Sequence, residues 1–251
     1  MQIYKNCTKG KYWMAVKLKR LGACAVVIIL ATADAAAEVT RSQTIGAEGK
    51  REHIFYSEGK KIAVQTIDDD GNVTGTVGTI PDGTAIEYYD NGKMKATWNY
   101  QSGKLDGICT VYFENGELMF FNNYKEGKRD GTTMSYYEGQ KLKYRYEYKD
   151  GKLNGMVKKY YRNGTLAFEW NYTMGEREGT AKAYFKSGAV KAAWYFKDDR
   201  LEDITRVYHK DGAIKYIDTY RKGYKINRKA YDTKGKLEFE QDYPAEAGDT
   251  K

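Results

Sequence analysis

The sequence predicts an all-β protein made of tandem β-hairpins: an elongated, open, antiparallel β-meander of about 14 to 16 strands in a single layer. Three observations predict this fold. The 251 residues include 24 Tyr and 26 Gly but only 2 Pro, which is typical of strands joined by tight turns. Several residue positions recur every 24 residues. Between them, apolar and polar residues alternate with the period of two that a strand requires.

The repeat extends over most of the chain. Four series keep the 24-residue interval: Tyr88, Tyr112, Tyr136, Tyr160, Tyr184 and Tyr208; Met94, Leu118, Leu142, Leu166, Val190 and Ile214; Tyr100, Tyr124, Tyr148, Tyr172, Phe196 and Tyr220; and Gly83, Gly107, Gly131, Gly155 and Gly179. Related units begin near Tyr56 and at Tyr231, so about eight repeats fill residues 53–243. An insertion, 76–83, separates the first two units. Such units cannot fold alone and must stack on one another.

Each unit has the pattern of a hairpin, and residues 160–172 show it. Asn163 and Gly164 predict a tight turn, because both residues tolerate positive φ. In the strand after the turn, one face carries Leu166, Phe168, Trp170 and Tyr172, and the other carries Ala167, Glu169 and Asn171. A Gly-x-x-x-Gly loop then leads to the next unit. A polar lead-in, 38–52, precedes the repeats, and a polar tail, 244–251, follows them.

The N-terminus predicts a signal peptide over residues 1–37. Its three parts are the basic residues Lys17, Lys19 and Arg20, the apolar residues 21–33, and the small residues Ala35, Ala36 and Ala37. Met14 is a more usual start for such a signal than Met1. The apolar run reaches only about 20 Å, short of the roughly 30 Å hydrocarbon layer, so cleavage is preferred over a retained membrane anchor. We therefore expect an exported protein, periplasmic or extracellular, in a bacterial envelope.

Charge and cysteine content exclude several classes of function. Removing residues 1–37 lowers the net charge from +8 to +3, because six basic residues and one acidic residue leave. This low charge, together with export, argues against a nucleic-acid partner. Cys109 is the one cysteine beyond the leader, so we expect neither a disulfide framework nor a thiolate metal site. Cys109 is expected to be a small buried side chain.

No motif for catalysis or for a cofactor occurs in the sequence, and we expect neither an enzyme nor a cofactor site. The acidic run 68–70 suggests a calcium loop. However, placing Gly71 at the sixth loop position puts Thr66 first and Val77 twelfth, where carboxylates are required. We therefore expect a solvated turn. His209 occupies an aromatic position of the repeat and is expected to be structural.

Two rows of residues form the candidate binding surface. The first row is Trp98, Tyr146, Trp170 and Trp194, which share one position of the repeat. A ladder of flat rings suits stacking on sugars or docking of an extended partner, and the alternative is that it forms the packing core. The second row is Lys95, Lys143, Lys191 and Lys215, expected on the opposite face of the same strands. It suits anionic lipid or polysaccharide, and the alternative is a solvated face.

The pattern Gly-x4-Tyr-Tyr-x-Asn-Gly-x-Leu-x5-Tyr-x2-Gly-Lys-x2-Gly is clearest in residues 83–107 and 155–179. It resembles the variant MORN repeat family, which includes the YwqK-type antitoxins, over nearly all of residues 53–243. The resemblance implies a run of hairpins that serves as an interaction scaffold without catalytic residues. For antitoxin-like members it implies a toxin as partner, a role that an export signal does not suit.

The leading hypothesis is an exported, non-enzymatic repeat scaffold that binds another protein. The alternatives are a binder of membrane surfaces through the Lys row and a binder of cell-envelope carbohydrate through the aromatic row. A toxin-neutralising, immunity-like role also stays open. The end strands of an open meander offer unpaired edges, so dimers through edge strands are a further hypothesis.

Overall fold

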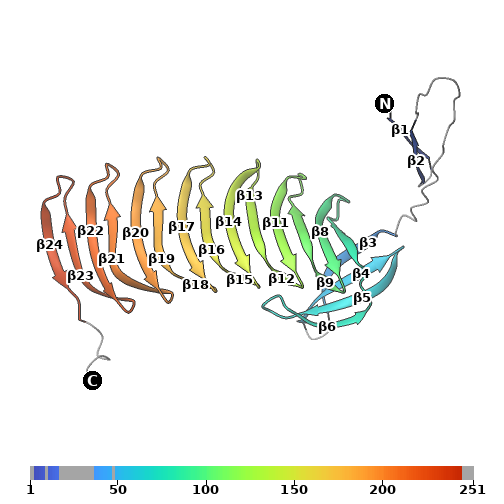
Figure 1. Cartoon of the computed structure of the whole chain (residues 1–251), viewed down its shortest axis with the longest axis horizontal. Coiled ribbons are helices and arrows are strands. Elements are labelled where there is room, and N and C mark those ends of the chain that lie inside the picture. The colour runs from blue at the N-terminus through green and yellow to red at the C-terminus, as the bar shows by residue number, and fades with distance from the viewer. Residues whose placement is uncertain (1–2, 9–10, 17–36, 47–48, 245–251) are drawn as a thin grey trace. The chain divides into compact units, whose positions relative to one another are not determined.

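The computed structural model describes residues 3–8, 11–16, 37–46 and 49–244. The chain divides into two units, 1–37 and 38–251. The first unit contains one antiparallel hairpin, formed by β1 (Ile3–Thr8) and β2 (Lys11–Val16) (Figure 1). The apolar run and most of the cleavage site of the predicted signal peptide lie outside the described residues, as does nearly all of the polar tail. Within the described residues, no helix has the length and apolar character needed to cross a membrane.

The second unit is one open, mostly antiparallel sheet of 22 strands, which confirms the predicted all-β hairpin array. The strands are β3 (Val39–Ile45), β4 (Arg51–Ser57), β5 (Lys60–Ile67), β6 (Val73–Gly78), β7 (Gly83–Tyr88), β8 (Met94–Gln101), β9 (Lys104–Leu105), β10 (Gly107–Tyr112), β11 (Leu118–Lys125), β12 (Lys128–Arg129), β13 (Gly131–Tyr137), β14 (Lys141–Lys149), β15 (Lys152–Leu153), β16 (Gly155–Tyr160), β17 (Leu166–Thr173), β18 (Glu176–Arg177), β19 (Gly179–Tyr184), β20 (Val190–Lys197), β21 (Arg200–Tyr208), β22 (Ile214–Arg221), β23 (Tyr224–Tyr231) and β24 (Leu237–Asp242).

The sheet has more strands than the sequence predicts, for two reasons. Four of the return loops contain a two-residue strand, β9, β12, β15 or β18, which pairs with the end of the preceding long strand. In addition, strand β3 lies within the segment expected to be a polar lead-in, and β6 covers the start of the predicted insertion. The return loops need glycine, as Gly103 and Gly107 show with φ values of 72° and 86°.

The N-terminal repeat does not lie beside the second repeat. Strand β3 pairs with β4 on one side and with β7 on the other, and the β3–β7 pairing is parallel, with Val39 opposite Ala85. The order of pairing is therefore β6-β5-β4-β3-β7-β8, and from β8 onward the hairpins follow in chain order. Residues 79–82 carry the chain from β6 back to β7. Sequence periodicity could not reveal β3, because no other unit has an equivalent strand.

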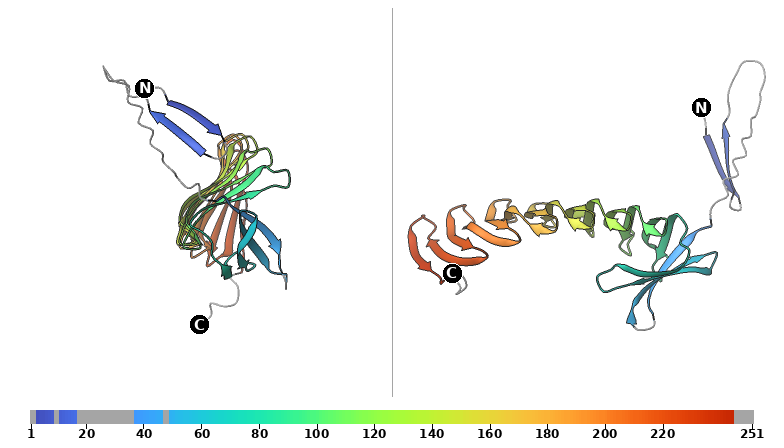
Figure 2. Two further views of the ribbon diagram at one scale, coloured as in Figure 1. Left: turned by 90° about the vertical axis from the view of Figure 1, so that its right-hand side faces the viewer. Right: turned by 60° about the horizontal axis from the view of Figure 1, so that its bottom comes forward.

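A hydrophobic core forms where β3 pairs with the hairpin β7–β8, the first of the hairpins that follow one another in chain order. Phe55, Ala63, Ile80, Ala85 and Tyr100 are buried there, and the rings of Phe55 and Tyr100 meet edge to face with centroids 5.3 Å apart. Strands β4 and β8 are separated in the sheet by β3 and β7, which corresponds to roughly 14 Å at about 4.8 Å per strand. The sheet must therefore bend sharply at this point. Figure 2 shows β3 to β6 lying across the end of the series of hairpins that begins with β7 and β8.

Two kinds of side-chain hydrogen bond recur between successive repeats. At the Asn-Gly end of the hairpins, the hydroxyls of Tyr89, Tyr137 and Tyr161 donate to the carbonyls of Tyr112, Tyr160 and Tyr184 over 2.6, 3.0 and 2.8 Å. At the return-loop end, the carboxylates of Asp82, Asp106 and Asp130 accept from the N–H groups of Ser102, Glu126 and Asp150 over 2.6, 3.0 and 3.2 Å. In the repeats that make both bonds, each end of the hairpin is thus hydrogen-bonded to a neighbouring repeat.

The tyrosine bonds predict a specific effect on stability. Replacing Tyr161 by Phe removes the bond to the Tyr184 carbonyl, so we expect Tyr161→Phe to lower the free energy of unfolding by about 1 kcal/mol. Urea unfolding followed by tryptophan fluorescence measures this change. The matched control is Tyr195→Phe, because Tyr195 is exposed and no hydrogen bond of its hydroxyl is described. Equal losses in the two variants would contradict the role given to the bond.

Candidate functional site

One side of the sheet, which we call the aromatic face, carries the large rings of the repeat. In the six successive hairpins from β7–β8 to β21–β22, a small residue of the first strand lies directly opposite a larger residue of the second. The pairs are Ala85 with Trp98, Cys109 with Asn122, Thr133 with Tyr146, Val157 with Trp170, Ala181 with Trp194 and Thr205 with Asp218. All six small residues are buried. The large side chains therefore cover the small ones within a single sheet, and the expected burial of Cys109 is confirmed.

The four residues of the predicted aromatic row lie on this face, and each is half-buried. The row is not continuous, because Asn122 and Asp218 occupy the same position in two other repeats. Trp98 lies at the N-terminal core, where the Arg41 guanidinium lies 3.9 Å from its ring centre. Tyr146, Trp170 and Trp194 lie further along the row, away from that core. The accessible part of the predicted row is therefore these three residues.

Lys95 does not lie on the face opposite the aromatic face, where the sequence predicts the Lys row. The Lys95 ammonium lies 2.8 Å from one oxygen of Glu87, and the other oxygen accepts a hydrogen bond from the Trp98 indole over 3.2 Å. The reason is a β-bulge: Glu87 pairs with Ala96 and Tyr88 with Met94, so Lys95 is the extra residue and strict alternation fails.

The other three lysines of the row are also the extra residues of bulges. Lys143 lies 5.5 Å from the ring centre of Tyr137 and 6.0 Å from that of Tyr144, and Lys215 lies 5.2 Å from that of Tyr216. Lys191 is exposed, and no ring contact is described for it. Three of the four lysines of the predicted Lys row therefore lie against aromatic rings and do not form a continuous basic stripe.

The middle of the aromatic face holds a group that sequence reasoning missed. We call it the central cluster: Tyr144, Tyr146, Lys159, Phe168 and Trp170. The Lys159 ammonium lies between two rings, 5.4 Å from the centre of Tyr144 and 5.7 Å from that of Phe168. Each of these rings stacks on the next aromatic residue of its own strand, with centroids 5.3 and 5.2 Å apart.

A signal for Lys159 exists in the sequence. Its position is otherwise held by Glu87, Val111, Ser135, Ala183 and Val207, so one lysine stands in a row of mostly small or apolar residues. Burial, followed by the nearby Tyr144 and Tyr148 hydroxyls, raises the pKa of Tyr146 to about 12. Tyr146 is therefore neutral at neutral pH, and the Lys159 ammonium lies among aromatic rings, a surface that suits an apolar partner with an acidic group.

An ion pair lies at each end of the aromatic face, fully buried at the N-terminal end and partly buried at the C-terminal end. At the N-terminal end the Arg41 guanidinium donates to Glu87 over 2.9 Å and to the Tyr100 hydroxyl over 3.3 Å, and both charged side chains are buried. At the C-terminal end Arg228 donates to both oxygens of Asp218 over 2.6 and 2.7 Å. The aromatic face is therefore bounded by charge at each end.

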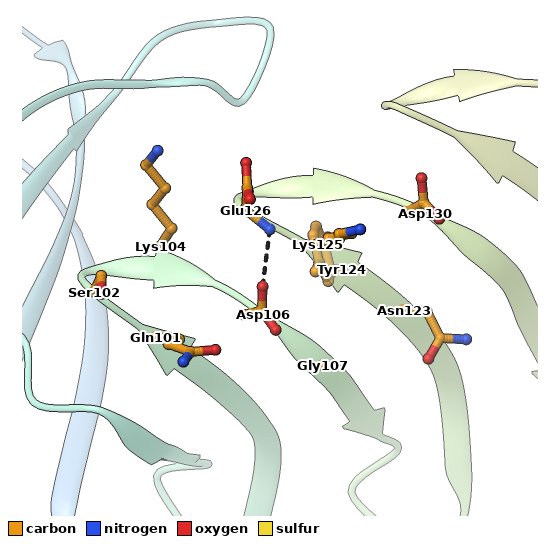
Figure 3. Close-up of a pocket in the computed structure, with 10 residues that line it drawn as sticks. All are labelled: Gln101, Ser102, Lys104, Asp106, Gly107, Asn123, Tyr124, Lys125, Glu126 and Asp130. Atoms are coloured by element: carbon orange, nitrogen blue, oxygen red, sulfur yellow. Dashed lines mark hydrogen bonds between the residues drawn. The ribbon is translucent and has the colours of Figure 1, made fainter.

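An open hollow of about 860 Å³ lies between two successive return loops. Figure 3 shows the residues that line it. Its lining is polar and includes Lys104, Asp106, Glu126 and Asp130, and Asp106 already accepts the Glu126 N–H that joins the two repeats. Within the parts of the chain that the structure describes, no group of three or more His, Cys, Asp or Glu side chains is placed to hold a metal ion.

At the acidic run, Asp68 accepts the Asn72 N–H over 2.7 Å in an exposed turn. The hydrogen bonds from Asn72 lower the pKa of Asp68, although its slight burial acts in the other direction. The solvated turn expected from the sequence is what the structure shows.

The Arg41–Glu87 pair predicts a large effect of a single substitution. Arg41→Met leaves the buried Glu87 carboxylate with Lys95 as its one cation, so we expect a loss of about 3 kcal/mol in the free energy of unfolding. The control is Arg177→Met, which breaks the exposed pair with Asp199 and is expected to cost less than about 1 kcal/mol. Urea unfolding distinguishes the two. A loss below about 1 kcal/mol for Arg41→Met contradicts the structural role of the pair.

His53 predicts a pH dependence of stability. Burial, followed by the positive charge of Arg41, lowers the pKa of His53 to about 4, against 6.5 for a free histidine. Between these two pH values the unfolded chain binds a proton that the folded chain does not bind, so the free energy of unfolding falls as pH drops through this window. Unfolding at pH 7 and pH 4.5 is compared for the natural protein and His53→Gln. We expect a smaller loss in the variant, and an equal loss would show that other groups cause the dependence.

The comparisons with known proteins agree with this geometry. A family model described as MORN repeat variant matches residues 81–102, 105–126 and 153–173, which contain the hairpins β7–β8, β10–β11 and β16–β17. No curated protein matches the chain. The antitoxin-like subgroup suggested by the sequence pattern stays a prediction. The three matched hairpins are therefore similar to the MORN repeat variant, and most of the other hairpins of the sheet keep the same 24-residue spacing.

Proposed function

We propose that the chain is a non-enzymatic repeat scaffold that binds another protein across its aromatic face. MORN repeats suggest a scaffold for protein or membrane interactions. The observation that carries the choice of a protein partner is the central cluster, in which rings from two hairpins lie against the Lys159 ammonium. Aromatic residues are enriched at the centre of protein interfaces, and here they gather on an open face of the sheet.

The accessibility of the aromatic face supports this proposal. From β10 onward the strands pair only with strands beside them in the same sheet, and no second layer of described residues is paired to them. The rings are half-buried by their neighbours, and Phe120 on the same face is 39% exposed. An interface here would bury apolar area that the chain leaves in water.

The place of action is part of the proposal. Residues 1–37 have the three parts of a secretion signal, which supports export to a periplasmic or extracellular site. An immunity-like role, in which the partner is a toxin, fits the resemblance to YwqK-type antitoxins but requires that toxin and scaffold meet outside the cytoplasm.

A second candidate function is binding to an anionic membrane surface. Lys143 and Arg162 both lie against the ring of Tyr137, with 5.5 and 5.1 Å to its centre, beside the central cluster. Cations held next to aromatic rings suit the interface between lipid headgroups and acyl chains. The carbohydrate hypothesis rests on Phe168 and Trp170, whose ring planes differ by only 4°.

The experiment compares rings on the two faces of the sheet. The full chain serves as bait, and proteins retained by it are measured again with Trp170→Ala and with Tyr195→Ala, whose exposed ring lies on the opposite face. We expect Trp170→Ala to weaken retention of a specific partner about 30-fold, as loss of an interface anchor does, and Tyr195→Ala to leave it unchanged. Circular dichroism checks that both variants keep their strand content.

Three outcomes contradict the proposal. The first is that the full chain retains no protein above a scrambled-sequence bait. The second is that both variants lose the partner equally. The third is that no protein binds, whereas the full chain floats with phosphatidylglycerol vesicles and Trp170→Ala abolishes this flotation. The last outcome would support the membrane-surface alternative.

A further inference from the structure

A line of unpaired cations crosses the face opposite the aromatic face. We call it the basic row: Lys158, Lys182 and Arg206, which are 24 residues apart. The structure joins them through consecutive cross-strand neighbours, since Lys158 pairs with Glu169, Glu169 with Lys182, Lys182 with Ala193, and Ala193 with Arg206. Directly paired residues lie on the same face of a sheet, so the three cations form one line across β16 to β21.

The cations of the basic row are not neutralised by salt bridges. Among the described residues, no ion pair engages any of the three, whereas the cations at the two ends of the line are paired: Arg145 with Glu147 over 2.6 Å, and Lys229 with Glu240 over 3.3 Å. Glu169 lies within the row, and its carboxylate accepts the Tyr184 hydroxyl over 2.5 Å. The row therefore presents three cations and one engaged carboxylate.

Tyrosines accompany the cations at the same interval. Tyr160, Tyr184 and Tyr208 each follow a cation by two residues, and all three are half-buried. The bond from Tyr184 to Glu169 places that ring on the face of the basic row. Tyr195, two residues from Ala193, is 37% exposed. The cations thus form one line across the strands, and the tyrosines form a second line beside it.

The interval between cations selects the conformation of a ligand. Consecutive cations are two strands apart, which is about 9.6 Å at about 4.8 Å per strand. A polyproline II helix repeats every three residues and rises about 3.1 Å per residue, so equivalent side chains are about 9.3 Å apart. An extended β-strand places same-side residues about 6.7 or 13 Å apart and does not match.

We infer that the basic row binds a polyproline II segment of another polypeptide with Asp or Glu at every third position. The carboxylates pair with Lys158, Lys182 and Arg206, and the intervening prolines pack against the tyrosine rings, as prolines do in aromatic-lined grooves. This site lies on the face opposite the central cluster and does not depend on the function proposed for that cluster.

Two labelled peptides of equal charge test the spacing. The first is Glu-Pro-Pro repeated three times, and the second is Glu-Pro-Pro-Pro repeated three times, which keeps the conformation but moves the carboxylates to about 12.4 Å. Binding to the full chain is followed by fluorescence anisotropy at low salt. We expect the first peptide to bind about tenfold more tightly. Equal affinities would overturn the inference, because they would show attraction by charge alone.

Variants of the chain test the position. Lys182→Glu is expected to weaken binding of the first peptide about tenfold, since it replaces an attraction by a repulsion. Its matched control is Lys141→Glu, an exposed charge reversal outside the basic row, which is expected to change binding less than about twofold. Equal effects of the two reversals would overturn the inference.

A gain of binding completes the test. Met134 occupies the position of the cations in the preceding repeat, as its pairing with Arg145 shows. Met134→Lys extends the row in register, so we expect it to tighten binding of Glu-Pro-Pro repeated four times about threefold, with no effect on the peptide of three repeats. Competition by polygalacturonate at the same carboxylate concentration would overturn the inference in favour of an acidic glycan.

Discussion

The whole sheet depends on one constraint: a single layer of strands must bury apolar surface without a second layer to cover it. The solution is the cross-strand pair of a small and a large residue, such as Val157 opposite Trp170, repeated from strand to strand. The ring lies over the small side chain, which is only 4% exposed, while the ring itself stays half-buried. The same large side chains therefore stabilise the hairpin and leave apolar surface exposed to a partner.

The same constraint explains the ends of the array. A repeat in the middle of the array is covered by a neighbour on each side, whereas a repeat at the end has only one neighbour. Terminal repeats of such arrays therefore differ from the rest. Here the aromatic face ends in Arg41 and Glu87 at one side and in Asp218 and Arg228 at the other. The N-terminal end adds a folded-over core around Phe55 and Tyr100, so the array is closed there by packing as well as by charge.

The sequence was sufficient to predict the fold because each hairpin carries its own turn glycines, its own alternation and its own rings. It also placed Trp170 and Tyr146 in one row. It could not place Lys95 correctly, since a bulge adds one residue and the alternation gives no sign of it. Nor could it reveal β3 or the role of Arg41, because those contacts join segments that share no repeat position. Lys159 was visible as a departure from the other residues at its position, and the basic row as a recurrence every 24 residues, but their roles depended on which strands are neighbours.

The parallel pairing of β3 with β7 has a consequence for how the chain folds. Val39 and Ala85 must meet across 46 residues before the N-terminal end can form, and closing such a loop costs conformational entropy that no local contact repays. Every later hairpin joins strands adjacent in the chain, so its contacts are local and form quickly. The difficult step therefore belongs to the part of the chain that is synthesised first. Each later hairpin can then add to an edge that already exists, so folding can follow synthesis from the N-terminus without waiting for the last residue.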